Sequence, residues 1–178
     1  ATEVIDCRGA TLLPGFVESH LHLGLGGAEL TQLQLGGVTG IATVQAKVRD
    51  YAAKNPGLTV LFAQGVGYDA FGQPATRQLL DQIIADRPLA LMAPDHHTVW
   101  ANSAALMAAG LMGGASLPAG HEVVMAPDGT ATGELREFEA FGPIIALGGD
   151  TRLNLGIATG AEPAPWPAEA DMAIDRAK

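Results

Sequence analysis

Two histidines near the N-terminus stand at a spacing that suits a metal ion. His20 and His22 flank a single leucine in the stretch PGFVESHLHLG, residues 14–24. Neutral imidazole is the most common protein ligand for zinc and similar ions. On a strand, residues two apart share a face, so both rings can reach one ion, with Glu18 beside them as a supporting carboxylate or a ligand. The spacing alone also fits hydrogen-bonded histidines at the end of a strand.

A second group of polar residues follows an apolar run in the middle of the chain. The stretch PDHHTVWANS, residues 94–103, comes directly after LALMA. Polar side chains crowded at the end of a buried strand often line a pocket. His97 and Trp100 are candidates to bind a small molecule. Asn102 also suits the N-cap of a helix and Trp100 also suits the core, so both kinds of role stay open.

Three more polar residues lie at the ends of predicted strands. Tyr68 and Asp69 directly follow the apolar run 58–67. Glu137 ends a strand-like run and is a candidate to approach the metal site. The alternative for Glu137 is a solvated glutamate at the start of a helix. His121 is predicted to lie on the surface.

Strands and helices alternate along the chain, which predicts an α/β fold. The apolar runs 58–67 and 89–93 are predicted to be buried strands. A helix is predicted to begin with Thr39 as its N-cap and to end at Asn55. Thr76 is the predicted N-cap of a second helix.

A β-hairpin is predicted near residue 130, which makes a purely parallel sheet less favoured. The segment 121–137 has alternating apolar residues on both sides of an Asp-Gly pair at 128–129, a strong turn signal. A short helix is predicted before it, at 103–109. The pattern weakens after residue 141, and a last helix is predicted from Trp166 onward.

Composition and charge exclude several classes of partner. The 178 residues suffice for one domain with a sizeable core. A net charge of −9, with no basic cluster, disfavours nucleic acid and anionic membranes. No apolar run is long enough for a transmembrane helix. The single cysteine, Cys7, excludes an internal disulfide and favours a reducing, cytoplasmic location.

The start of the chain resembles the amidohydrolase superfamily. There, a strand of a small β-sandwich leads through LPGF-(I/V)-D-x-H-x-H into the first strand of a (β/α)8 barrel. The matching residues are Leu13, Pro14, Gly15, Phe16, His20 and His22. Glu18 stands where the family usually has Asp.

The middle of the chain resembles the N-substituted formamide deformylase-like branch, the third amidohydrolase-type domain family. That branch carries a large insertion after its first barrel strand, and residues 65–106 follow its pattern in order. The matching residues are Pro74, Arg77, Leu80, Asp81, Asp86, Arg87, Pro88, Asp95, His97, Trp100, Asn102, Ser103 and Leu106, followed after the hairpin by Gly133, Leu135 and Glu137. His96 replaces the family's usual Gly.

The resemblance implies a metal-dependent hydrolase for non-peptide carbon–nitrogen bonds of small amide-like substrates, with a metal-activated water. It implies His20 and His22 as ligands of one or two divalent ions, most often zinc, and Glu18 and Glu137 as supporting carboxylates. It implies substrate contacts from His97, Trp100, Tyr68 and Asp69. The remaining ligands and the catalytic Asp belong to later barrel strands with no counterpart in this sequence. No catalytic residue is therefore assigned, and the chain alone is expected to be an inactive fragment.

The resemblance also divides the chain. The expected parts are 1–13 as the end of the β-sandwich, 14–37 as the first barrel strand and its loop, 38–150 as an α/β insertion domain, and 151–178 as a linker and the start of the next helix. Unpaired strand edges favour a homo-oligomer. Two other hypotheses stay open: a non-catalytic α/β module that binds a small ligand or partner through Asp95–Asn102, and a structural fragment that is stable only in an assembly.

Overall fold

The computed structural model describes residues 8–11, 15, 29–30 and 32–148. The histidine pair His20 and His22 lies outside the described residues, and so do Glu18 and Cys7. The predicted β-sandwich end, first barrel strand and C-terminal helix lie outside them as well.

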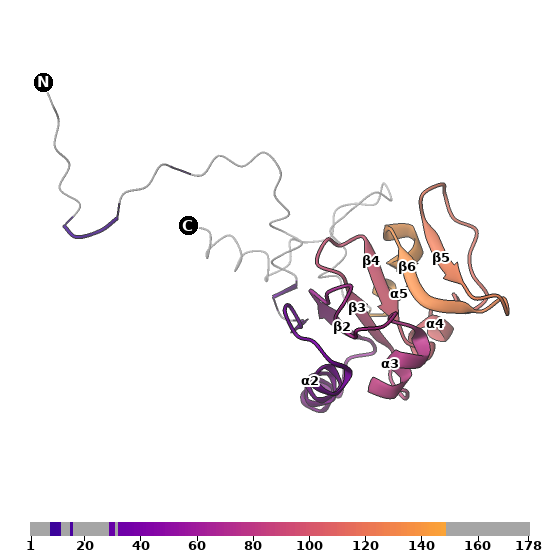
Figure 1. The fold of residues 1–178 in the computed structure, drawn as a ribbon, viewed down its shortest axis with the longest axis horizontal. Helices are drawn as coiled ribbons and strands as arrows, with labels where there is room; N and C mark the ends of the chain where they lie inside the picture. Colours follow the sequence, from indigo (N-terminus) through magenta and orange to yellow (C-terminus); the bar gives the residue numbers. More distant parts are fainter. Residues whose placement is uncertain (1–7, 12–14, 16–28, 31, 149–178) are drawn as a thin grey trace, which may run out of the picture.

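Six strands form one mixed sheet with the order β1-β2-β3-β4-β6-β5. The strands are β1 Leu33–Gln34, β2 Leu61–Gln64, β3 Leu89–Met92, β4 Thr98–Ala101, β5 Glu122–Met125 and β6 Ala131–Arg136. The first three run parallel, and β3, β4, β6 and β5 pair antiparallel (Figure 1). This confirms the α/β class and the departure from a purely parallel sheet.

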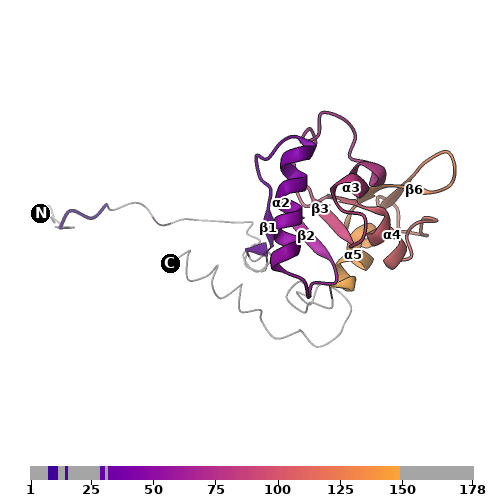
Figure 2. The same cartoon turned by 90° about the horizontal axis from the view of Figure 1, so that it is seen from below.

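Helices cover both faces of the sheet. They are α2 Ile41–Lys54, α3 Arg77–Ile83, α4 Ser103–Ala108 and α5 Phe138–Leu147. Buried residues of α2 and α3 belong to one apolar cluster, and those of α4 and α5 belong to a second. In Figure 2, α2 lies across the strands β1 and β2. Within the described residues, no helix is long and apolar enough to cross a membrane.

The strands β2 and β3 are buried throughout because both of their faces are covered, and all of their residues except Gln64 are apolar. Alternate residues, Leu61, Ala63, Leu89 and Leu91, pack into the cluster under α2 and α3. The residues between them, Phe62, Ala90 and Met92, pack into the cluster under α4 and α5. Successive residues of these strands therefore contact opposite clusters in alternation, although their hydropathy does not alternate.

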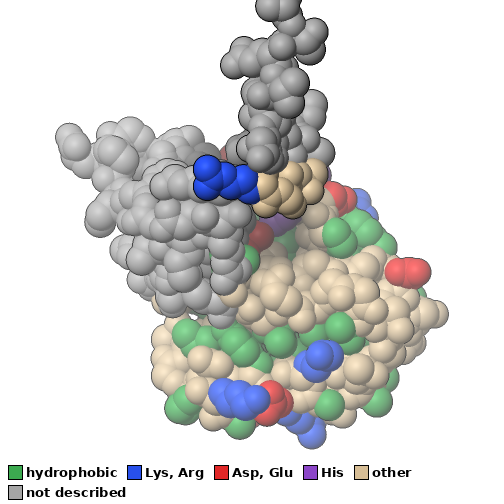
Figure 3. Space-filling view, turned by 90° about the vertical axis from the view of Figure 1, so that its left-hand side faces the viewer, with side chains coloured by type: hydrophobic (Ala, Val, Ile, Leu, Met, Phe, Trp, Pro, Cys, Tyr) green, Lys and Arg blue, Asp and Glu red, His purple; other side chains and the backbone are tan. Residues whose placement is uncertain are grey.

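The helix α2, unlike β2 and β3, is covered on one side only. Val44, Val48 and Ala52 are buried at helical spacing, whereas Lys47 and Asp50 are exposed. Figure 3 shows charged side chains interspersed with hydrophobic ones over this helix, at the bottom of the view. The exposed surface of α2 therefore combines charged and hydrophobic side chains.

One predicted helix cap is wrong, and two elements were not predicted. The N-cap of α2 is Gly40, at φ 83, and not Thr39. The hydrogen bond from Gly40 N–H to the carbonyl of Ala70 holds this left-handed turn, which Gly adopts more readily than Thr. The stretch 94–103 contains the strand β4, because its apolar residues Val99 and Trp100 are buried on opposite faces.

The second unpredicted element is α5, which continues beyond residue 141, where the sequence pattern weakens, as far as Leu147. Pro143 lies inside this helix. Its neighbours Phe141 and Ile144 are buried against the sheet. Packing of this apolar face stabilises the helix despite the cost of an interior proline.

Polar residues at one end of the sheet serve the fold. Asn102 is fully buried, and its side-chain oxygen accepts from the N–H of Leu89 and of Ala105, at 3.0 and 2.9 Å. Its amide donates to the carbonyls of Ile84 and Arg87, at 2.8 Å each. The helix-cap interpretation of Asn102 is confirmed, and the residue also ties α3 to β3.

A second network at the same end involves further motif residues. The N–H and hydroxyl of Ser103 donate to the carboxylate of Asp81, at 2.9 and 2.7 Å. Arg77 donates to that hydroxyl at 3.1 Å and to the carbonyl of Ala131 at 3.0 Å. Much of the motif that carries the family resemblance is therefore scaffolding.

Candidate functional site

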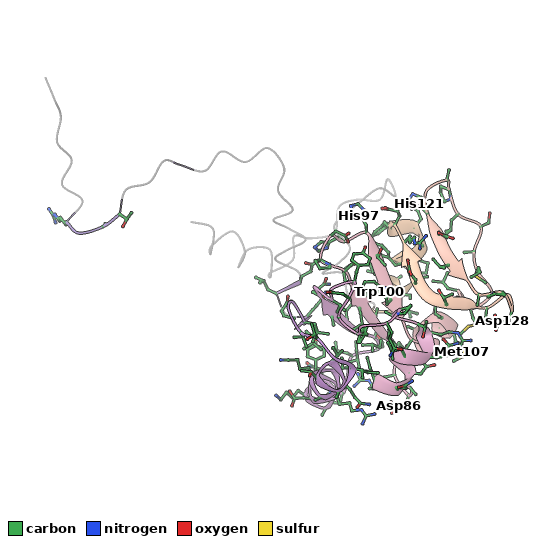
Figure 4. The ribbon with its side chains drawn as sticks, in the orientation of Figure 1. Asp86, His97, Trp100, Met107, His121 and Asp128 are labelled. Atoms are coloured by element: carbon green, nitrogen blue, oxygen red, sulfur yellow. The ribbon has the colours of Figure 1, made fainter. Side chains whose placement is uncertain are left out.

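The strand directions bring the polar candidates to one end of the sheet. The strands β1 to β3 and β6 end there, and β4 and β5 begin there. The side chains at this end, which we call the polar edge, are Tyr68, Asp95, His96, His97, Thr98, His121 and Glu137. Figure 4 shows His97 and His121 at this end and Asp86, Met107 and Asp128 at the other. The topology therefore gathers residues that are widely separated in the sequence.

His97 and Glu137 form a pair at the centre of the polar edge. The Nδ1 atom of His97 lies 3.1 Å from Oε1 and 3.0 Å from Oε2 of Glu137. The backbone N–H of Glu137 also donates to the carbonyl of His97, at 2.9 Å. Both residues were candidates from the sequence, but their pairing was not predicted. Their strand-end positions were the only signal, because the pairing depends on the register of β4 with β6.

The pair is accessible and electrostatically coupled. The side chain of His97 is 65% exposed and that of Glu137 is 41% exposed. The hydrogen bond to the Glu137 carboxylate, followed by its charge, raises the pKa of His97 above the ordinary value. The nearby charge of Asp95 acts in the same direction. Both groups therefore favour the protonated imidazole, which is a hydrogen-bond donor, over the neutral ring, which can also accept.

Tyr68 and Asp95 stand beside this pair. The Tyr68 hydroxyl lies 2.9 Å from Thr98 Oγ1 and 3.2 Å from Asp95 Oδ2. The other carboxylate oxygen of Asp95 accepts from the N–H of His97 at 3.1 Å. Asp95 thus connects the backbone of His97 to the tyrosine, so Tyr68 and His97 lie in one connected group.

Trp100 is beneath the polar edge and does not form part of its surface. It is 4% exposed and packs in the core, with the ring of Tyr68 edge-on at 5.1 Å between ring centroids. This supports the core interpretation that the sequence left open. Asp69 is exposed and follows Tyr68. The substrate contacts predicted for these residues remain predictions.

The two other histidines of the polar edge also pair with carboxylates. His96, at φ 64, places Nδ1 3.2 Å from Oε1 of Glu29, a side chain that is only 13% exposed. Burial raises the pKa of Glu29 to about 7. His121 places Nδ1 2.6 Å from Oε2 of Glu139. Its side chain is 23% exposed, so this residue is partly buried and not fully on the surface as predicted.

These pairs do not form a metal site by themselves. In the part of the chain that the structure describes, no three His, Cys, Asp or Glu side chains are grouped so that they could hold a metal ion. The predicted ligands His20 and His22 lie outside that part. The described site is therefore an array of histidine–carboxylate pairs that can bind a polar ligand or move a proton.

A mixed α/β sheet with such an edge defines a domain equipped for acid–base or binding chemistry. Residues 3–176 match the family model described as "Amidohydrolase family". The chain therefore belongs to the amidohydrolase family. This confirms the resemblance seen in the motifs around His20 and His97.

Individual relatives agree with the family. The chain is 35% identical over 136 residues to a putative amidohydrolase, YtcJ, of Bacillus subtilis, covering 75% of the chain and 26% of that relative. It is 30% identical over 146 residues to N-substituted formamide deformylase of Arthrobacter pascens, covering 78% and 26%. The chain spans about a quarter of the length of these relatives.

A solved structure shares the fold. The crystal structure of an uncharacterized metal-dependent hydrolase from Pyrococcus furiosus matches with a TM-score of 0.50 and 25% identity. The match covers 92% of this chain and 28% of that one. The mixed α/β fold of this chain is therefore shared with a segment of that hydrolase.

Proposed function

We propose that this chain is part of a metal-dependent hydrolase that cleaves non-peptide carbon–nitrogen bonds in small amide-like molecules. Membership of the amidohydrolase family supports the reaction class. The relative named N-substituted formamide deformylase supports an amide-like substrate. The proposal carries over the expected division of the chain: the barrel contributes 14–37, and 38–150 form the insertion domain.

The proposed metal ligands are His20 and His22, with Glu18 as a supporting carboxylate. Two imidazoles two residues apart are a donor set that suits a divalent ion, and zinc is the proposed metal. The metal would supply Lewis acidity and a water of lowered pKa. The described residues add no further ligand group, so the rest of the ligand set is proposed to come from other strands of the barrel.

The polar edge is proposed to hold the substrate. The observation that carries this assignment is the His97–Glu137 pair, which leaves the exposed imidazole free to bond a carbonyl or an N–H group. Tyr68 and Asp69 are proposed to line the same pocket, with Trp100 supporting Tyr68 from below.

We further propose that a polypeptide of these 178 residues does not hydrolyse such substrates by itself. Two histidine ligands bind a metal weakly. The expected result is no metal-dependent release of formate or acid from N-formyl or N-acyl amines by the purified chain. Measurable hydrolysis that a chelator abolishes would contradict this.

The metal ligands can be tested in a protein of the relatives' full length that contains this segment. Replacing His20 and His22 together by Ala is expected to lower both bound zinc and hydrolysis by at least about 100-fold. A double variant on the exposed side of α2, Lys47→Ala with Asp50→Ala, is the control, since neither residue belongs to the polar edge or to the proposed ligands. Full metal content and full activity in the double histidine variant would overturn the proposed function.

A further inference from the structure

Glu137 is joined to His97 by two separate bonds. One is between the carboxylate and Nδ1, and the other runs from the backbone N–H of Glu137 to the carbonyl of His97. A side-chain bond alone lets an exposed ring turn, whereas the backbone bond keeps the two residues in register. The orientation of the imidazole is therefore set by Glu137.

The backbone of Glu137 is strained. Its φ is 65, in the left-handed region that non-glycine residues seldom adopt. Such residues persist where the surroundings hold them, and they concentrate at functional sites. Glycine would fit this turn, immediately before α5, without strain. What glutamate adds at this position is its carboxylate, which reaches His97.

The bond determines which ring nitrogen is available. A carboxylate only accepts hydrogen bonds, so the Nδ1 atom of His97 carries the hydrogen. The other ring nitrogen, Nε2, has no hydrogen-bond partner among the described residues, and the side chain is 65% exposed. In the neutral ring Nε2 is an acceptor, and in the imidazolium it is a donor.

We propose that Glu137 is a positioning residue that fixes His97 as the Nδ1–H tautomer and presents Nε2 to the substrate. This rests on the proposed substrate contact of His97. It replaces the sequence-based expectation that Glu137 supports the metal site, because the carboxylate is engaged by the histidine. The charged groups that face His97 are Glu137 and Asp95, and both favour its protonated form.

The alternative to the positioning role of Glu137 is a purely structural role, and experiment must distinguish the two. Glu137 could serve only to join the end of β6 to the segment before β4. The structural role predicts a loss of stability when the side chain is removed and no change in how His97 titrates once the fold is kept. The positioning role predicts that the pKa and the tautomer of His97 change even when the fold is kept.

The first experiment is an NMR titration of His97 in the 178-residue chain with labelled histidine. In Glu137→Gln the pKa of His97 is expected to fall, and the ring is expected to become a mixture of tautomers. Glu137→Gly is expected to give the same change while retaining the fold, because glycine tolerates the positive φ. Glu139→Gln, which removes an equal charge two residues along the chain, is expected to leave His97 unchanged. An unaltered pKa and tautomer in Glu137→Gln would overturn the proposal.

The second experiment measures kinetics in an active, full-length protein that contains this segment. Glu137→Gln is expected to lower kcat/KM by about 10-fold. The double variant with His97→Asn is expected to be no worse than His97→Asn alone. If His97→Asn lowers kcat/KM and Glu137→Gln does not, the positioning role is overturned and the substrate contact stands. If neither variant has an effect, the proposed contact of His97 is wrong and the positioning role falls with it.

Discussion

The two ends of the sheet use polar residues in different ways. At the polar edge, His97 and Glu137 are exposed and bond mainly side chain to side chain. At the opposite end, Asn102 is buried and all four of its bonds go to backbone groups. A polar side chain whose bonding capacity is filled by the backbone stabilises the fold. A polar side chain that keeps an exposed, unused hydrogen-bonding atom is available for chemistry.

The comparison predicts the largest effect at the buried amide. Asn102→Ala leaves the N–H of Leu89 and the carbonyls of Ile84 and Arg87 without partners. We expect a loss of about 4 kcal/mol of unfolding free energy, because each buried unpaired group costs about 1–3 kcal/mol. Urea denaturation followed by circular dichroism measures this. Asn102→Asp keeps the acceptor and should lose less, and a loss below about 1 kcal/mol in Asn102→Ala would show that the amide is not a structural centre.

Gly133 tests how tightly the same scaffold is packed. A methyl group there would lie 2.6 Å from the backbone N of Arg77 and 2.8 Å from the carbonyl oxygen of Ala101, at a φ of 111. Gly133→Ala is expected to destabilise the fold by about 3 kcal/mol, because rigid backbone must move. Gly129→Ala, at the hairpin turn with open space around it, is the control and should lose less. Equal thermal midpoints for the two variants would contradict this packing.

Glu29 predicts an intermediate, pH-dependent effect at the polar edge. Its folded pKa of about 7 lies above the unfolded value of 4.5. The stability from holding this proton is therefore full below about pH 4.5 and is lost as pH rises through about 7. Glu29→Gln should flatten that decline and be more stable by about 2 kcal/mol at pH 8. Urea midpoints from pH 4 to 8 test this against Asp50→Asn, an exposed control, and an unchanged pH profile would refute it.

The smallest stability effect is expected at His97. His97→Asn removes an exposed ring, so the unfolding midpoint at pH 8 should match that of the parent chain. Because its pKa is raised, the stability contributed by the His97–Glu137 pair is full at acid pH and is lost as pH rises through the folded pKa. A large destabilisation at pH 8 would place His97 with the scaffold and erase the contrast between the two ends.

Local features were predictable where neighbours in the sequence decide them. Thr76 caps α3, and its hydroxyl accepts from the N–H of Leu79. The hairpin around Asp128-Gly129 forms as predicted. The errors arose where distant contacts decide. β4 was hidden among polar residues, and α5 extends through Pro143 because its apolar face is buried.

For the same reason, the residues of the candidate site could be predicted but the contacts between them could not. His97 and Glu137 could be named because they follow predicted strands, and Tyr68 could be named from the family resemblance. Their partners could not, because Glu137 reaches His97 across 40 residues through the pairing of β4 with β6. The contact between His96 and Glu29 had no local signal at all.

By itself, the sequence determined the family, the α/β class and the residue types available for chemistry, because motifs and periodicity are local. Only the tertiary structure decided which polar residues serve the fold and which remain open. Asn102 and His97 belong to one short stretch of polar residues, yet β4 carries them to opposite ends of the sheet. Asn102 is buried there, and backbone groups use all of its hydrogen-bonding capacity. The side chain of His97 is exposed to solvent, which leaves its Nε2 atom accessible.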